Sequence, residues 1–499
     1  MDPDDVLPMR PMRVLFAASE MAPWVKTGGL GDVAGALPDA LAAAGCDVRV
    51  LLPAYPRLMQ ALPQRSLVAH VDRLGGALPP ARLWRAHLPG GLQVLLLDAE
   101  SLYARDGNPY LGPDGRDWPD NGMRFGLLAR VAALLSSGDS PLTWRPQVLH
   151  CNDWQTGLAP AFLHFLHPGR AAASVMTVHN LSFTGSFDAA LMTDLGLPWH
   201  AFRFDAVEFH GRLSFLKAGL QLADRITTVS PTYADEILRP EFGCGLEGLL
   251  RHRRDRLSGI LNGIDTVVWD PARDPALEVC YDAATLARKR EGRAALQRAL
   301  GLAAQDTAPL LGVISRLTEQ KGLDLLLQAA DRLLSQRMQL AVLGSGEAWM
   351  EQGFRDLAAR HPGACAVRIG FDETLAHRIE AGADLFVMPS RFEPCGLNQM
   401  YSLRYGTPPI VRRTGGLADT VVDASGPPLH DGTANGFVFD APSADALAGT
   451  VERAAALWRD RPRFEALQRA GMRADFGWHV AARRYLEVYR AAASPADAD

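Results

Sequence analysis

The chain has 499 residues, of which 48% are hydrophobic and 21% charged, so it can bury more than one hydrophobic core. Its net charge of −5 provides no general attraction to nucleic acid or to an anionic membrane surface, so neither is expected as a partner. The six cysteines lack C-x-x-C spacing, which argues against a disulfide framework and a zinc site and favours a reducing cytoplasm. No run of about 18 apolar residues occurs, so we expect no membrane-spanning helix.

From Met12 onward, short β-branched or leucine-rich runs alternate with longer helical patterns. The strand-like runs are Arg13–Ala18, Val48–Pro53, Gln93–Asp98, Val148–His150, Ser174–Val178 and Arg225–Val229. Such alternation predicts a parallel sheet covered by helices. We expect this N-terminal Rossmann-like domain to span residues 1–270.

A turn-rich segment over residues 260–275 precedes a second alternation. Its strand-like runs are Leu310–Ser315, Gln339–Gly344, Ala366–Ile369, Asp384–Pro389 and Pro408–Val411. We expect a second Rossmann-like domain over 271–475 and a C-terminal helix within 476–499 that packs back on the first domain. The predicted fold class is therefore α/β, with two doubly wound domains facing a cleft. Ligands of such sheets bind beyond the carboxyl ends of the strands.

A glycine-rich turn occurs twice, each time between a strand-like and a helix-like run. The first extends from Lys26 to Asp32 and contains Gly28 and Gly29, and the second extends over 413–419. Each turn is expected to present free backbone N–H groups at the start of a helix, where anions bind. For one glycine pair alone, an ordinary strand-to-helix turn is the commoner explanation.

Cations and a carboxylate follow two strands of the second domain. Arg316 and Lys321 lie between a strand and a helix, so both can reach one anionic group, such as a departing diphosphate. Glu393 follows another strand, and Pro394 and Gly396 force a turn before a helix that begins near Leu397. Amides that hold phosphate and a carboxylate that accepts sugar hydroxyls suit a nucleotide-sugar. Solvated surface charges and an exposed loop glutamate are the plain alternatives.

Polar residues also end two strands of the first domain. His179 and Asn180 follow one strand, and the segment 150–155 ends the strand before it. These groups point into the same crevice, although a histidine at a strand end is more often a structural hydrogen-bonder. Asp-x-Asp occurs only at Asp2–Asp4 and Asp497–Asp499, so the carboxylate pair that usually holds a metal-bound diphosphate is missing, and we expect no metal and no cofactor.

Taken in order, these segments resemble bacterial glycogen synthases and plant starch synthases, the retaining glucosyltransferases of the GT-B architecture. The resemblance extends from Met12 to about Tyr489. It rests on Lys26–Leu30, Val178–Asn180, Phe209–Gly211, Ser214–Gly219, Val229–Tyr233, Asn262–Asp265, Ser315–Leu317, Gln320–Gly322, Glu393–Leu397 and Arg412–Thr420. It implies transfer of glucose from ADP-glucose to the non-reducing end of an α-1,4-glucan such as glycogen, with retention of configuration and without a metal.

The resemblance implies four catalytic residues. Arg316 and Lys321 bind the diphosphate, Glu393 binds glucose hydroxyls, and His179 holds the sugar near its 6-hydroxyl. We expect the diphosphate to leave as the cations take up its charge, and the acceptor to attack the oxocarbenium-like sugar on the same face.

The first domain is expected to supply substrate-binding residues around the first glycine turn. Asp32 and Asn180 line the sugar pocket. Lys26, Gly28 and Gly29 help to close the donor site.

Further substrate-binding residues are expected in the second domain. Phe371 stacks on the base, and the turn through Cys395, Gly396 and Leu397 holds a phosphate with backbone amides. Asn398 stands where the family usually has threonine, so an amide contact to phosphate replaces a hydroxyl contact.

Three other functions fit parts of the pattern. The motifs specify the base pocket poorly, so a UDP-glucose-using GT-B transferase is the nearest alternative. A phosphorylase fits less well, because the chain is short and shows no lysine motif for pyridoxal phosphate. A glucan-binding scaffold without turnover would keep the same fold.

Overall fold

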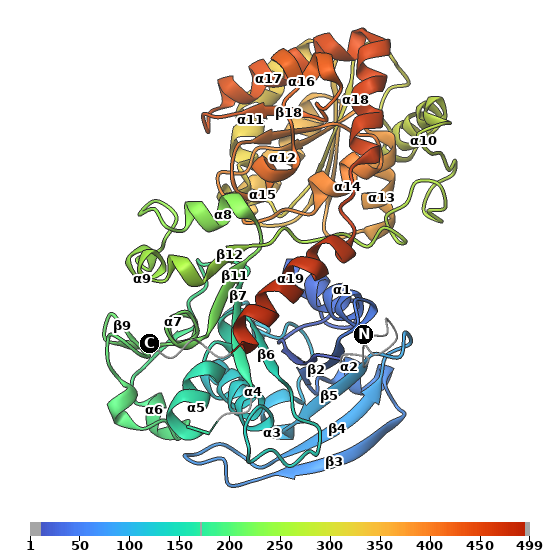
Figure 1. Cartoon of the computed structure of the whole chain (residues 1–499). Helices are drawn as coiled ribbons and strands as arrows, with labels where there is room; N and C mark the ends of the chain where they lie inside the picture. The colour runs from blue at the N-terminus through green and yellow to red at the C-terminus, as the bar shows by residue number, and fades with distance from the viewer. Residues whose placement is uncertain (1–10, 170–171, 495–499) are drawn as a thin grey trace, which may run out of the picture. The chain divides into compact units, whose positions relative to one another are not determined.

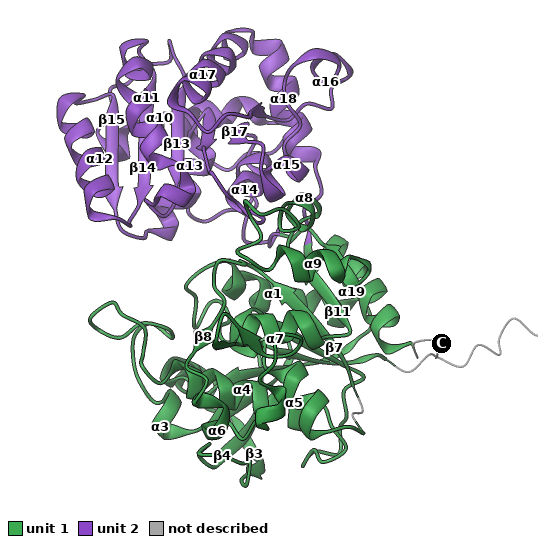
Figure 2. Cartoon of the chain, turned by 90° about the vertical axis from the view of Figure 1, so that its left-hand side faces the viewer, with its two compact units in different colours: residues 1–263, 478–499 green, residues 264–477 purple. Residues whose placement is uncertain are grey.

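The computed structural model describes residues 11–169 and 172–494. The chain divides into two compact units, one made of Met1–Gly263 with Trp478–Asp499 and the other of Ile264–Gly477 (Figure 2). Residues 1–10 and 495–499, which belong to the first and last expected segments, lie outside the described residues. Residues 264–270, expected in the first domain, belong to the second unit. The reason is packing: the Trp269 ring is stacked between the rings of His377 and Tyr401, with centroids 3.8 Å away on each side.

The first unit is built around a nine-stranded sheet with the order β12-β11-β7-β6-β1-β2-β5-β4-β3. Pairing is parallel from β12 to β5, whereas β4 and β3 add antiparallel strands at one edge. The strands are β1 (Arg13–Ala17), β2 (Asp47–Pro53), β3 (Arg65–Val71), β4 (Ala81–His87), β5 (Gln93–Asp98), β6 (Val148–Asn152), β7 (Ala173–Val178), β11 (Arg225–Thr228) and β12 (Leu257–Gly259). The strand-like runs predicted in this unit are therefore confirmed.

Helices cover this sheet, and a small antiparallel sheet extends the unit. The helices are α1 (Gly29–Ala43), α2 (Pro56–Ala61), α3 (Glu100–Tyr103), α4 (Asn121–Leu135), α5 (Ala159–Leu166), α6 (Leu191–Asp194), α7 (Phe215–Leu222), α8 (Pro231–Glu236), α9 (Glu247–His252) and α19 (Trp478–Ala493). The small sheet has the order β8-β10-β9, with β8 at Ser186–Phe187, β9 at Glu208–Phe209 and β10 at Arg212–Ser214. The β6 strand is buried along its whole length, as expected for a central parallel strand.

The second unit contains a six-stranded, all-parallel sheet with the order β15-β14-β13-β16-β17-β18. Its strands are β13 (Leu310–Ile314), β14 (Gln339–Gly344), β15 (Cys365–Ile369), β16 (Leu385–Met388), β17 (Pro409–Arg412) and β18 (Phe437–Phe439). Its helices are α10 (Lys289–Leu300), α11 (Leu323–Ser335), α12 (Ala348–Arg360), α13 (Glu373–Gly382), α14 (Asn398–Arg404), α15 (Gly415–Thr420), α16 (Gly426–Asp431), α17 (Ala444–Arg459) and α18 (Arg461–Arg473). Two doubly wound α/β units are the predicted fold class.

The strand orders locate the ligand-binding edge of each sheet. In the second unit the order reverses between β13 and β16, and in the first it reverses between β1 and β6. Crossover connections leave to opposite faces at such a point, so the loops after these strands diverge and leave room for a ligand. The loops after β1, β6, β13 and β16 are therefore where binding groups are expected.

The C-terminal helix α19 completes the first unit. It packs against α1, β6 and β7, and Figure 1 shows it lying beside α1. The Tyr489 hydroxyl lies 2.7 Å from Nδ1 of His150, whose Nε2 lies 2.6 Å from the Thr177 hydroxyl. Burial lowers the pKa of His150 to about 3, so its ring is neutral at physiological pH. This polar chain connects the last helix to the centre of the sheet.

We expect Tyr489→Phe to destabilise the first unit by about 1–3 kcal/mol, because the variant leaves a buried imidazole nitrogen without its partner. Equilibrium denaturation in urea measures the change. Turnover per folded molecule is expected to stay at the wild-type value. An unchanged free energy of unfolding would show that this hydrogen bond does not hold α19.

No helix within residues 11–169 and 172–494 combines the length and the apolar character that a membrane span requires.

Candidate functional site

A buried ion pair lies at the switch point of the second unit. Lys321, in the loop after β13, donates from Nζ to Oε2 of Glu393, in the loop after β16, at 2.5 Å. The Ser390 hydroxyl donates to the same carboxylate oxygen at 3.1 Å. Only 6% of the Glu393 side chain and 18% of the Lys321 side chain are exposed. The structure thus brings together two of the four predicted catalytic residues.

Neighbouring arginines hold the loop that carries Glu393. Arg391 forms two hydrogen bonds with the Asp324 carboxylate, at 2.6 and 2.7 Å. The Arg412 Nε donates to the carbonyl oxygen of Ser390 at 2.9 Å. Because bidentate pairs fix geometry as well as charge, these contacts hold the turn around the buried carboxylate. Sequence reasoning did not single out Arg391, Asp324 or Ser390.

The second glycine turn has a different role from the one predicted. Gly415 has φ +43°, and a Cβ there would lie 1.9 Å from the carbonyl oxygen of Glu393. A Cβ on Gly416 would lie 2.6 Å from Cα of Cys395, and the Gly416 N–H donates to the carbonyl of Pro394 at 3.2 Å. The expectation of free amides here is therefore wrong for Gly416. These glycines let the turn pack closely against the loop that contains Glu393 and Cys395, and the turn thereby supports that loop.

Arg316 is exposed at the carboxyl end of β13, and no hydrogen bond or ion pair holds its guanidinium among the described residues. Its charge is therefore available to an anion. Phe371, after β15, is 82% exposed, so its ring is available for stacking. Arg316 and Phe371 are thus exposed, in contrast to the buried and paired side chains of Lys321 and Glu393.

The start of α14 forms the other side of this loop. Gly396 has φ +70°, and Leu397 is the N-cap residue of α14. The backbone N–H groups at the start of a helix have no carbonyl partner within the helix. The Asn398 side-chain nitrogen donates to the carbonyl of Ile314, the last residue of β13, at 2.7 Å. One N–H of this amide is thus used to join α14 to β13, which the sequence did not indicate. Cys395 is buried, and its carbonyl accepts a hydrogen bond from the Gln399 side chain at 3.1 Å.

In the first unit, the first glycine turn lies open. Lys26 pairs with Asp32 at 2.7 Å, and both side chains are partly exposed. A Cβ built on Gly28 or Gly29 would meet no atom within 4 Å, and neither residue has a positive φ. Packing and backbone conformation therefore do not require glycine at these positions. The turn leaves room for another molecule to approach its backbone closely.

Glu20 holds this turn in place and was missed by sequence reasoning. Its carboxylate accepts a hydrogen bond from the Thr27 N–H at 2.6 Å and from the Tyr110 hydroxyl at 2.9 Å. Only 3% of Glu20 is exposed, and burial raises its pKa although these hydrogen bonds oppose the shift. The signal that could have found it is its place just after β1, at the switch point.

His179 is oriented by the end of the neighbouring strand. The Asn152 amide nitrogen donates to the carbonyl of Ala17 at 3.1 Å, so Asn152 Oδ1 faces His179 Nε2, 3.0 Å away, as an acceptor. Burial lowers the pKa of His179 to about 3, and the neutral ring therefore carries its proton on Nε2. Nδ1 is left as an acceptor suited to a hydroxyl group.

Asp153 holds the backbone of the segment that contains His179 and Asn180. Its Oδ1 accepts a hydrogen bond from the His179 N–H at 3.0 Å, and it also bonds the Asn180 N–H. The backbone of Asp153 has φ +57° and ψ −177°, a region that residues other than glycine rarely occupy. Burial raises the pKa of Asp153 to about 7. A strained, buried acid thus holds the loop that contains His179 and Asn180.

The raised pKa of Asp153 predicts a pH-dependent stability. Between about pH 4 and pH 7 the native state keeps a proton that the unfolded chain releases, so wild-type stability is lost as pH rises through this window. Asp153→Asn keeps the acceptor oxygen and removes the titration. We expect its stability advantage over wild type to grow with pH by about 4 kcal/mol at most and to level off above about pH 8. Urea denaturation of both proteins at several pH values measures this; parallel curves would contradict it.

Within the described parts of the chain, no group of three or more His, Cys, Asp or Glu side chains is arranged to hold a metal ion.

Comparison with known proteins shows the family in which the polar groups around Glu393 and around His179 occur. The model of the starch synthase catalytic domain matches residues 13–252, and that of glycosyl transferases group 1 matches residues 301–470. A glycogen synthase from Dechloromonas aromatica (strain RCB) is 60% identical over 482 residues, which cover 97% of this chain and 99% of that protein. The chain belongs to the glycogen and starch synthase family.

Other members of the glycogen and starch synthase family agree in length and in fold. A glycogen synthase from Aromatoleum aromaticum (strain DSM 19018 / LMG 30748 / EbN1) is 55% identical, with 97% of this chain and 98% of that protein covered. The catalytic domain of Starch Synthase IV from Arabidopsis thaliana, solved bound to ADP and acarbose, has a TM-score of 0.86 and 33% identity. That comparison covers 97% of this chain and all of that structure. The protein is thus a retaining glycosyltransferase with the GT-B fold.

Proposed function

We propose that the protein transfers glucose from ADP-glucose to the non-reducing end of an α-1,4-glucan such as glycogen, with retention of configuration. The observation that carries the proposal is the Lys321–Glu393 pair at the switch point of the second unit, together with Arg316 in the same loop after β13, whose guanidinium has no partner among the described residues. A buried carboxylate suits sugar hydroxyls, and the two cations suit the diphosphate. The ADP in the Starch Synthase IV structure supports an adenosine donor.

In this mechanism the protein stabilises the leaving group more than the sugar. Negative charge grows on the departing ADP, and Arg316, Lys321 and the amides of Gly396 and Leu397 neutralise it. Glu393 is held at Oε2 by Lys321 and Ser390, and we assign its carboxylate to the glucose hydroxyls. The acceptor hydroxyl then bonds to C1 on the face from which the ADP leaves, and its proton passes to the phosphate oxygen released from C1.

We assign the groups of the first unit to the transferred glucose and to closure over the donor. His179 offers Nδ1 as an acceptor for the 6-hydroxyl, with Asn180 and Asp32 as neighbouring polar groups. Lys26 gives a cation, and the open backbone at Gly28 and Gly29 gives close access to the donor.

In the second unit we assign Phe371 to the base: its exposed ring stacks on the adenine. The six cysteines are free thiols, which fits a reducing compartment, so we propose that the reaction takes place in the cytoplasm.

Incorporation of labelled glucose into glycogen tests the proposal. We expect incorporation from ADP-glucose to exceed that from UDP-glucose and to need no added cofactor. Faster transfer from UDP-glucose would favour the other donor. Binding of ADP-glucose and glycogen without incorporation would favour a glucan-binding scaffold, and both outcomes would overturn the proposal.

A further inference from the structure

A basic pocket lies in the second unit at the edge of the sheet opposite to Lys321 and Glu393. It is formed by the first turn of α10, the end of α13, the segment before β16 and the first turns of α18. Asp384 precedes β16 at its amino end, whereas Glu393 follows the carboxyl end of the same strand. The cavity volume is about 40 Å³. A single water needs ~10–15 Å³ in such a space, so the pocket holds a group of a few heavy atoms.

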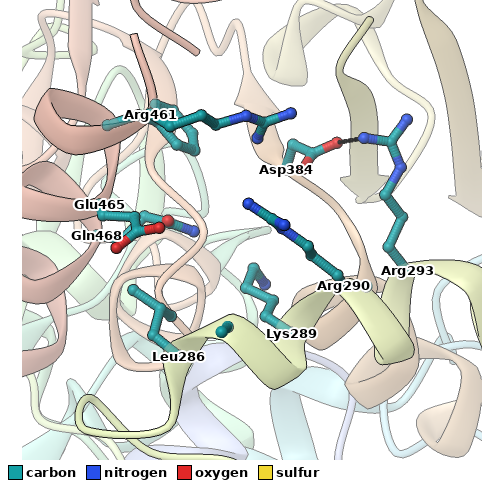
Figure 3. Close-up of a pocket in the computed structure, with 11 residues that line it drawn as sticks. Leu286, Lys289, Arg290, Arg293, Asp384, Arg461, Glu465 and Gln468 are labelled. Carbon is teal, nitrogen blue, oxygen red and sulfur yellow. Dashed lines mark hydrogen bonds and ion pairs between the residues drawn. The ribbon is translucent and has the colours of Figure 1, made fainter. Parts of the chain in front are cut away.

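Two arginines in this pocket carry charge that the protein does not neutralise. The guanidinium groups of Arg290 and Arg461 extend into the space between α10 and α18 (Figure 3). Among the described residues neither has an ion pair or hydrogen bond, although Arg461 stacks on the Trp458 ring at 3.7 Å. Burial lowers the pKa of Arg461, and the positive charges of Arg290 and Arg293 act in the same direction while Asp384 opposes them.

The acidic groups of the pocket already have partners. Asp384 accepts hydrogen bonds from Arg293 at 2.7 Å and from the Leu310 N–H at 2.8 Å. Glu465 pairs with Arg469 at 3.2 Å, on the following turn of α18.

Lys289, the other cation on the first turn of α10, already has partners. Its ammonium group contacts the Ala381 carbonyl at 2.7 Å and the Thr407 hydroxyl at 2.6 Å. Burial lowers the pKa of Lys289 to about 7. The excess positive charge therefore comes from Arg290 and Arg461.

The positions of these arginines on their helices are unfavourable without a ligand. Arg461 is the first residue of α18, and Arg290 is the second residue of α10. Helix starts are the positive ends of the helix dipole and favour acidic side chains. Buried Arg293, only 6% exposed, also has an Nε without a partner in the described structure. The guanidinium groups of Arg290 and Arg461 therefore repel the positive helix ends and one another, and a bound anion would offset this repulsion.

We propose that this pocket binds the phosphoryl group of a small ligand, either inorganic phosphate or a phosphate monoester. Guanidinium groups present paired N–H donors that match the oxygens of a phosphoryl group. The small volume accommodates the phosphoryl group, and the exposed Arg290 places any remainder of the ligand toward solvent. The site is separate from the nucleotide-sugar site and does not depend on the proposed function.

Calorimetric titration of the full-length protein with inorganic phosphate and with glycerol 1-phosphate, at constant ionic strength set with chloride, tests the proposal. The variant is Arg290→Gln/Arg461→Gln, and the matched control is Arg463→Gln, an exposed arginine of the same helix turn that does not line the pocket. We expect the double variant to weaken phosphate binding about tenfold or more, and the control to change it less than about twofold. In phosphate-free buffer the double variant is expected to melt at or above the wild-type temperature, because the like charges no longer repel.

Each outcome bears on the proposal. Tighter binding of glycerol 1-phosphate than of phosphate supports a phosphate monoester as ligand, and equal binding supports recognition of the phosphoryl group alone. Heat release that survives in the double variant but disappears in Arg316→Ala would place the anion at the candidate donor site and overturn the inference. Absence of phosphate binding by the wild type would also overturn it, and the melting temperatures show whether each variant is folded.

Discussion

Lys321→Ala is expected to lower kcat for glucosyl transfer by about 10²–10³. Lys321 supplies a positive charge where the proposed diphosphate departs, and it holds the buried carboxylate of Glu393 at 2.5 Å. Because the charge on the leaving group grows only as the bond breaks, the loss appears in kcat more than in KM. Steady-state rates with ADP-glucose and glycogen measure the effect.

The stability of Lys321→Ala must be measured beside its activity. Removing the lysine leaves Glu393 buried without its counter-ion, and breaking such a pair costs about 3–5 kcal/mol. The double variant Lys321→Ala/Glu393→Gln removes both charges, so we expect it to regain part of the stability and none of the activity. A Lys321→Ala protein with wild-type kcat would remove Lys321 from the catalytic residues.

Arg316→Ala is expected to lower kcat by a similar factor, about 10²–10³, while leaving the free energy of unfolding unchanged. The reason is the absence of any ion pair or hydrogen bond to this exposed guanidinium in the described structure. A charge without a protein partner contributes little to folding, so its loss is felt only when a ligand is present. Parallel measurements of turnover and urea denaturation separate the two effects.

Arg413→Ala is the matched control for Arg316→Ala. Arg413 follows β17, another strand of the same sheet, is also exposed, and pairs with Asp440 at 2.7 Å. We expect its replacement to change kcat by less than about twofold, because Asp440 already pairs with its charge, and to change the free energy of unfolding by only about 0–1 kcal/mol. Equal losses of activity in both variants would indicate a general electrostatic effect and would contradict a specific role for Arg316.

Much of the fold was predictable because it depends on local periodicity. Buried parallel strands are continuous apolar runs, as in Leu310–Ile314, and the helices between them have an apolar face. The strands β3 and β4 were not predicted, because arginine and histidine interrupt their apolar residues and hide the pattern of a strand. The unit boundary near residue 264 was misplaced because the stacking of Trp269 on His377 is a contact between distant segments.

The candidate site was predictable where it depends on strand ends and glycine turns. Lys321 was expected to bind the diphosphate and Glu393 the glucose hydroxyls; the structure places both side chains in one ion pair, which the sequence did not indicate. The second glycine turn looked like the first, yet its glycines are explained by close contact with the backbone of Glu393 at Gly415 and of Cys395 at Gly416. Glu20 was missed because its place after β1 becomes informative only once the strand order puts β1 at the switch point. Local sequence thus indicates which groups are available, and only tertiary contacts show which are already occupied.

The discontinuous first unit has a consequence for biosynthesis. Its last helix, α19, is separated from the rest of the unit by the whole of 264–477. At ~5–20 residues per second, a ribosome needs roughly 10–40 s to make that intervening stretch. During this interval β6 and β7 lack the helix that covers them, and His150 lacks the Tyr489 hydroxyl. The second unit is continuous and can therefore fold on the nascent chain before the first unit is finished.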